Sequence, residues 1–190
     1  MLLSTCLFAL LIASALGVSD SDFGPCKTVE YDNTFDLRKI IPRIYVYSTP
    51  DLPGLEVLDG TVLNLKLSAD NNELIFATAE GHLDDKIEKT NYTSILPATG
   101  VVEEHYLDDI GDEVTVNMVL LGVVEECKSL VVYRCSFSGT LETDIVQVLK
   151  KDISTPMTDA CKAKVDSIIN RSNLKTNPFR VLPYKQKNKN

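Results

Sequence analysis

His82 and His105 are the only histidines of this 190-residue chain, and they restrict the chemistry that it could perform. Nucleophilic catalysis needs a base held beside a nucleophile, and the sequence contains no Gly-x-Ser-x-Gly turn to present one. Histidines at metal-ligand spacing and a carboxylate-rich calcium loop are also missing from the sequence. We therefore predict that the protein is not an enzyme and that it requires no metal and no cofactor.

One compact polar run, Glu103-Glu104-His105, could still carry binding chemistry. It can be interpreted as the solvated face of a strand, or as part of a site for haem or an amine. The solvated face is the simpler interpretation, because charged side chains usually remain exposed. We nevertheless keep His105 as a candidate ligand-binding residue.

The cysteines indicate an oxidising compartment. The apolar run Leu2–Leu16 precedes Gly17, so residues 1–17 are expected to be a secretory signal peptide that takes Cys6 with it. The remaining chain has an even number of cysteines, which predicts two disulfides in a secreted, extracellular protein. Two sequons, at Asn91 and Asn170, are candidate N-glycosylation sites.

The charge of the chain argues against two classes of partner. The formal net charge is −8, which disfavours binding to phosphate backbones and to anionic membranes. Basic residues cluster only in the tail, and residues 185–190 are predicted to be a disordered, solvated end. We expect no nucleic-acid partner and no membrane span.

Short runs rich in β-branched and aromatic residues alternate with Gly, Asp, Asn and Pro along the chain. Such a rhythm is typical of an all-β sandwich or an up-and-down barrel. Eight strands are predicted: Ile44–Thr49, Gly60–Ser68, Glu73–His82, Asp85–Ser94, Gly100–Leu107, Glu113–Val124, Ser129–Phe137 and Glu142–Lys151.

A helix should follow the last strand. Thr155 could cap it and Pro156 fits a first turn, while an apolar stripe continues to about Arg171. The sequence therefore predicts an antiparallel barrel of eight strands with a C-terminal helix on its outside.

This layout, together with the stretch FDLRKIIPRIYVYSTP, resembles the lipocalin family, in its secreted invertebrate, apolipoprotein D-like branch. The likeness covers roughly residues 25–184 and implies one barrel domain over residues 18–184. Two family motifs are altered: Ile44 replaces the tryptophan of the first strand, and Lys151 falls where an arginine is usual. Because that arginine packs on the tryptophan ring, the two changes agree, and Ile44 should close the barrel floor by simple burial.

The disulfide pairing can be narrowed by geometry. Cys127 and Cys135 flank one strand roughly 26 Å apart if it is extended, whereas disulfides need Cα atoms about 4.4–6.8 Å apart. In an up-and-down barrel the loop with Cys127 lies at the floor, where the last strand ends before Cys161. We predict the pairs Cys127–Cys161 and Cys26–Cys135; the second also matches the family's bond.

The expected ligand site follows from the pairing. If Cys135 points outward to reach Cys26, then Leu130, Val132, Arg134 and Ser136 point inward. The family register adds Ile145, Gln147 and Leu149 of the last strand. A buried Arg134 would need an acid such as Glu103, or a ligand carboxylate.

Two functions are compatible with such a barrel. One is a secreted carrier that holds a small hydrophobic or amphipathic ligand, such as a lipid, fatty acid or pigment. The alternative is a secreted, for example salivary, inhibitor whose loops bind a host protein, or which sequesters an amine, eicosanoid or haem.

Overall fold

The computed structural model describes residues 26–51, 58–83, 86–107, 111–138, 141–176 and 178–184. The predicted signal peptide, residues 1–17, and the predicted basic tail, residues 185–190, lie outside the described residues, so both stay predictions.

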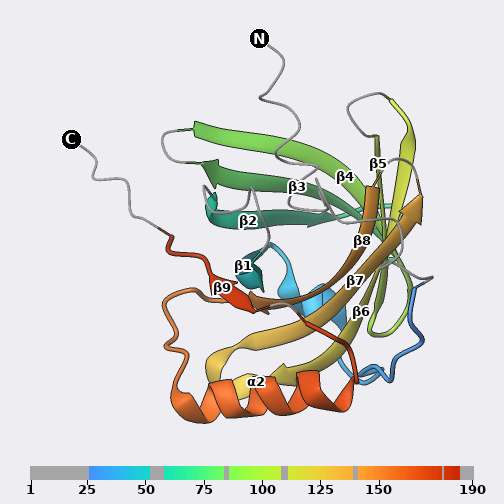
Figure 1. The fold of residues 1–190 in the computed structure, drawn as a ribbon. Helices are drawn as coiled ribbons and strands as arrows, with labels where there is room; N and C mark the ends of the chain where they lie inside the picture. Colours follow the sequence, from blue (N-terminus) through green and yellow to red (C-terminus); the bar gives the residue numbers. More distant parts are fainter. Residues whose placement is uncertain are drawn as a thin grey trace.

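Eight antiparallel strands form a closed barrel (Figure 1). The ring closes because β1 pairs with both β2 and β8, so that the barrel strands leave no long pair of open edges. A short ninth strand pairs with the end of β1. The bounds are β1 Arg43–Pro50, β2 Leu58–Leu67, β3 Leu74–Leu83, β4 Lys86–Ala98, β5 Val101–Leu107, β6 Glu113–Val124, β7 Ser129–Ser138, β8 Leu141–Lys150 and β9 Phe179–Val181.

The eight predicted strands are all present, which confirms the predicted fold class. The largest difference in bounds is in β4, which continues beyond Ser94 to Ala98. The sequence analysis did not predict β9, whose three residues are too few to show a period.

The barrel core is built from strand alternation. Leu63 and Leu65 of β2 lie opposite Ala79 and Ala77 of β3, so these side chains share the inner face. A short 3₁₀ helix, η1 (Leu37–Ile40), belongs to the same core at one end of the barrel. Ile44 is completely buried there, as predicted for the residue that replaces the tryptophan.

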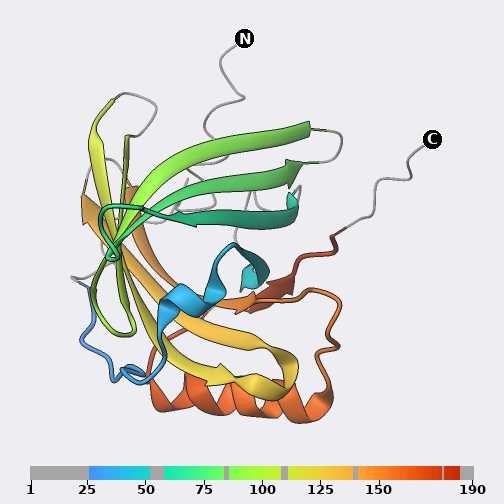
Figure 2. The same ribbon diagram turned by 180° about the vertical axis from the view of Figure 1, so that it is seen from behind.

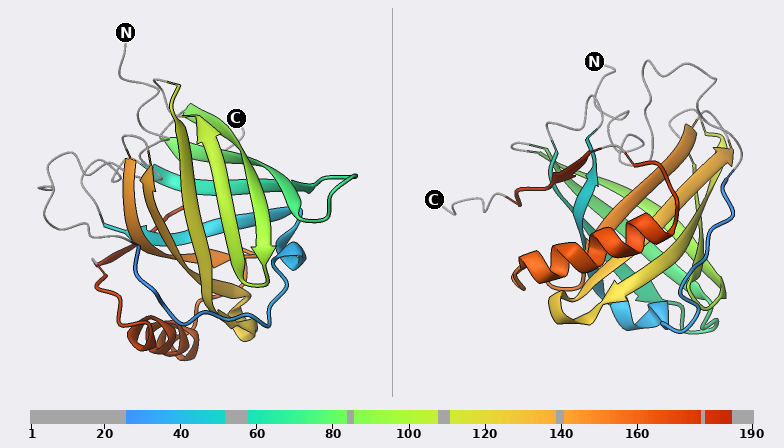
Figure 3. Two further views of the ribbon diagram at one scale, coloured as in Figure 1. Left: turned by 90° about the vertical axis from the view of Figure 1, so that its right-hand side faces the viewer. Right: turned by 60° about the horizontal axis from the view of Figure 1, so that its bottom comes forward.

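One α-helix, α2 (Asp159–Arg171), lies along the outside of the barrel (Figures 2 and 3). Its apolar face forms a second core with outward-facing residues of the barrel wall, among them Val131 and Val148. The predicted start at Thr155 and Pro156 was wrong. Thr158 caps the helix, because its hydroxyl accepts a hydrogen bond from the Cys161 backbone N–H.

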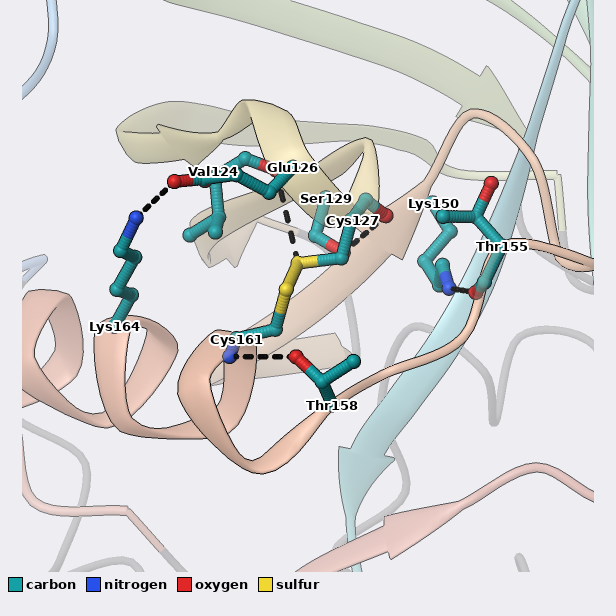
Figure 4. Close-up of a disulfide and its surroundings, with 9 residues drawn as sticks. All are labelled: Val124, Glu126, Cys127, Ser129, Lys150, Thr155, Thr158, Cys161 and Lys164. Atoms are coloured by element: carbon teal, nitrogen blue, oxygen red, sulfur yellow. Dashed lines mark hydrogen bonds and ion pairs between the residues drawn. A yellow bond between two sulfur atoms is a disulfide. The ribbon is translucent and has the colours of Figure 1, made fainter.

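Both disulfides are paired as predicted, Cys26 with Cys135 and Cys127 with Cys161. The Cα atoms are 5.6 and 6.3 Å apart respectively. Figure 4 shows the second bond, which joins α2 to the short turn after β6.

The lysine at the end of β8 is displaced by one position from its prediction. Lys150 is completely buried, and its ammonium group donates a hydrogen bond to the Thr155 carbonyl (Figure 4). Lys151, which the family pattern had assigned to this place, is exposed. Because successive residues of a strand face opposite sides, a shift of one residue exchanges the buried and the exposed lysine.

Candidate functional site

The inner face of the barrel carries most of the residues predicted to bind a ligand. Arg134 lies opposite Met118 of β6 and Ile145 of β8, all on the inner side. The chain neighbour of Arg134, Cys135, points outward to its disulfide partner. Five of the predicted ligand residues are buried on this face: Leu130, Val132, Arg134, Gln147 and Leu149. Ile145 is partly buried beside them.

Arg134 forms an ion pair with Glu104 of β5 inside the barrel. The two side chains are only 9% and 5% exposed. Burial lowers the pKa of Arg134, but the nearby Glu104 carboxylate outweighs that effect, and the net shift is upward. The suggestion that Glu103 supplies the acid was wrong, because Glu103 lies on the opposite face of β5.

The ion pair continues into a small polar network. Arg134 Nη1 donates to Gln147 Oε1 at 3.4 Å, and Gln147 Nε2 donates to Thr49 Oγ1 at 3.3 Å. Arg134 Nε is buried and has no hydrogen-bond partner among the described residues. The network therefore balances its charge but retains one open donor.

A hollow of about 960 Å³ crosses the wall beside this network. It lies where the β4–β5 ladder ends: the last pair toward Leu107 is Thr93 with His105. Inward-facing and outward-facing residues both line it. The inward group is Leu65, Ala77, Tyr92 and Tyr106, and the outward group includes Phe76, Asn91, His105 and Leu107.

Tyr92 and Tyr106 stand between the hollow and the ion pair. Tyr106 is two residues from Glu104 on the same face of β5, and Tyr92 is two residues from Ser94, which lies opposite Glu104. Burial raises the pKa of Tyr92, and the Glu104 carboxylate raises it further. The phenol of Tyr92 therefore remains neutral across the physiological range.

His105 lines the hollow from the outer face rather than from the barrel interior. Its ring lies 2.8 Å from the Glu103 carboxylate and is 25% exposed. The structure therefore separates His105, which lines the hollow, from the inner group around Arg134, which does not. Sequence reasoning missed Glu104, Tyr92 and Tyr106. Both faces of the run Glu103-Glu104-His105 are polar, so hydrophobic alternation did not assign Glu104 to the inner face.

Both sequon asparagines, Asn91 and Asn170, are exposed, and their glycosylation remains a prediction. Among the described residues, no three His, Cys, Asp or Glu side chains are grouped so that they could hold a metal ion. Within the same part of the chain, no helix has the length and apolar character needed to cross a membrane.

Comparison with known proteins supports the fold. No family model and no curated protein sequence matches the chain. Among solved structures, insecticyanin from the tobacco hornworm Manduca sexta superposes with a TM-score of 0.63 at 13% identity, over 86% of this chain and 88% of that one. A biogenic amine-binding protein superposes with a TM-score of 0.62 at 15% identity, over 83% of this chain and 86% of that one.

Lipocalin 12 from rat epididymis gives a TM-score of 0.62 at 15% identity, over 85% of this chain and 93% of that one. At such identities the likeness concerns the fold and not the ligand. The closed barrel, the outer helix and these superpositions agree: the chain has the lipocalin fold.

Proposed function

We propose that the protein is an extracellular carrier that binds a small hydrophobic or amphipathic molecule. The observation that carries this proposal is the hollow, whose volume of about 960 Å³ suits a small ligand. Tyr92 and Tyr106 at its inner end separate it by one layer of side chains from a buried polar network, and a few polar groups near an apolar wall are typical of ligand sites. Two disulfides are consistent with an extracellular location.

The ligand would enter through the hollow and lie against the inner wall. Leu130, Val132 and Leu149 are at most 3% exposed, so a ligand reaches them only when inner side chains move aside. Tyr92 and Tyr106 are the first such side chains beyond the hollow. We keep the proposed contacts at Arg134 and Gln147 for the polar end of the ligand, and at Ile145 for its apolar tail.

A second candidate is the sequestration of an amine, which one observation favours. Glu104 is a buried carboxylate behind Tyr92 and Tyr106, which line the hollow, and an ammonium group could pair with it. Two of the similar structures are named as amine-binding proteins, one of them in complex with tryptamine. In this chain, however, an amine would have to compete with Arg134 for Glu104.

The test of binding combines extraction with a blocking variant. Organic extraction and mass spectrometry of protein from its native source should yield a small, mostly apolar compound. With recombinant protein, an apolar fluorescent probe should bind, and Ala77→Phe should weaken its binding because Ala77 lines the hollow. Ala98→Phe, at an exposed site of the same strand system, is the matched control. Equal probe binding by all three proteins would contradict the proposed site.

A further inference from the structure

The Glu104–Arg134 pair spans the inner face of β6, the strand between them. Glu104 lies opposite Val116, and Arg134 lies opposite Met118. Both partners are more than nine-tenths buried. The charges cancel, so the pair presents one positive and one negative group, side by side, with no net charge.

A ligand that reaches this pair has to separate it. Removing one partner of a buried ion pair leaves the other charge uncompensated, which is strongly unfavourable. An ammonium ion alone would satisfy Glu104 but strand Arg134. A carboxylate alone would satisfy Arg134 but strand Glu104. Only a polar end with both charges can replace both contacts at once.

The network is prepared for such an end. Arg134 Nε is a buried donor without a partner among the described groups, so a carboxylate could take two guanidinium donors instead of one. Tyr92 and Tyr106 line the hollow, which is the proposed entry, and only this one layer of side chains separates the hollow from the ion pair.

We propose that the Glu104–Arg134 pair makes the site selective for ligands whose polar end carries both an ammonium and a carboxylate group. Analogues with only one of these charges should bind more weakly. The inference rests on the proposed small-molecule binding and specifies the ligand class for that site.

The chain contains tyrosines but no tryptophan, so an indole ligand can be excited selectively at the long-wavelength edge of its band, where tyrosine absorbs little. Four ligands share the indole body: 3-methylindole is neutral, tryptamine is cationic, indole-3-propionate is anionic, and tryptophan is zwitterionic. Tryptophan should bind at least roughly tenfold more tightly than tryptamine or indole-3-propionate, the scale of one lost charge contact.

Variants test the cause of this preference. Glu104→Gln should make indole-3-propionate the best of the charged ligands, and Arg134→Met should make tryptamine the best. Because each single variant leaves a buried charge and could fail to fold, the double variant E104Q/R134M removes both. It should bind 3-methylindole as before and lose the preference for tryptophan. Glu80→Gln, which removes an exposed pair with Lys89 on the outer face, is the control.

The outcomes distinguish the proposed charge selectivity from the proposed small-molecule binding. If 3-methylindole binds but tryptophan is no tighter than the singly charged ligands, the charge selectivity is wrong while small-molecule binding stands. Persistence of the tryptophan preference in E104Q/R134M would also overturn the selectivity. Tight tryptamine binding that Glu104→Gln abolishes favours the amine candidate instead. If none of the four ligands binds, the inference fails, while the proposed function stands or falls with the apolar probe and Ala77→Phe.

Discussion

Lys150 holds its ammonium group 5.2 Å from the centroid of the Tyr47 ring. Lys150 ends β8 and Tyr47 lies on β1, so the contact ties together two neighbouring strands of the barrel. Burial lowers the pKa of Lys150. The ring and the Thr155 carbonyl offset that penalty, because both attract a cation.

Lys150→Met should therefore destabilise the protein by about 1–2 kcal/mol, the scale of a lost hydrogen bond and a lost cation–π contact. Lys151→Met, one residue later and exposed, should change the free energy of unfolding by less than about 0.5 kcal/mol. Urea denaturation of the two variants measures the difference. A larger loss of unfolding free energy in Lys151→Met than in Lys150→Met would mean that Lys151, as the sequence pattern suggested, is the lysine that stabilises the end of β8.

Gly100 should be much harder to replace than Gly111. Both have positive φ, +79° and +91°, which costs an L-residue about 1–2 kcal/mol. A Cβ at Gly111 would meet nothing within 4 Å, whereas at Gly100 it would lie 2.1 Å from the backbone oxygen of Asp32. Asp32 is held in place by a hydrogen bond from its N–H to the Leu120 carbonyl.

We expect Gly111→Ala to cost about 1 kcal/mol and Gly100→Ala at least roughly 3 kcal/mol, since only the second adds a backbone clash to the strain. Thermal unfolding of both variants provides the comparison. Equal losses of stability would mean that the backbone around Asp32 does not pack closely against the turn between β4 and β5.

Much of the fold could be predicted from local pattern. The strands were visible because apolar residues alternate and turn residues interrupt them. Reach excluded a bond between Cys127, which precedes β7, and Cys135 near its far end. The barrel topology then selected the pairing, which also matched the family's bond. The outward direction of Cys135 then gave the inward direction of Arg134.

The errors within the strands share one physical cause: the predicted register of a strand was shifted by one residue. Glu103 and His105 were both given to the inner site, and both face outward, while Glu104 between them faces inward. In the run Glu103-Glu104-His105 both faces are polar, so no hydrophobic alternation fixes the face. The exchange of Lys150 and Lys151 has the same origin. The helix start differs for another reason: Lys150, five residues earlier at the end of β8, donates to the Thr155 carbonyl, and Thr158 caps the helix instead.

The two disulfides should contribute unequally to stability. Cys26–Cys135 joins residues 109 positions apart, and Cys127–Cys161 joins residues 34 apart. Closing a longer loop removes more entropy from the unfolded chain, so the first bond should stabilise by about 1 kcal/mol more in that model. Denaturant unfolding of the double serine variants C26S/C135S and C127S/C161S gives the two losses. A larger loss in C127S/C161S would show that packing of α2, rather than loop length, decides the order.

Tyr133 should make the protein sensitive to alkali. Its side chain is only 3% exposed beneath the helix side of the wall, and its hydroxyl oxygen accepts the Lys27 backbone N–H at 3.2 Å. Burial raises the pKa of Tyr133 to about 12, the Lys27 N–H opposes the shift, and Asp144 adds to it.

An unfolded tyrosine has a pKa of about 10, so the folded state favours the protonated phenol. The stability that Tyr133 contributes is complete below pH of about 10 and is lost as the pH rises through about 12. In Tyr133→Phe this contribution is absent at every pH. The difference in unfolding free energy between wild type and variant should therefore shrink between about pH 10 and 12, and urea titrations across that window measure it. Because the other tyrosines are common to both proteins, their ionisation cancels in the difference, and a constant gap over the window would mean that Tyr133 ionises alike in both states.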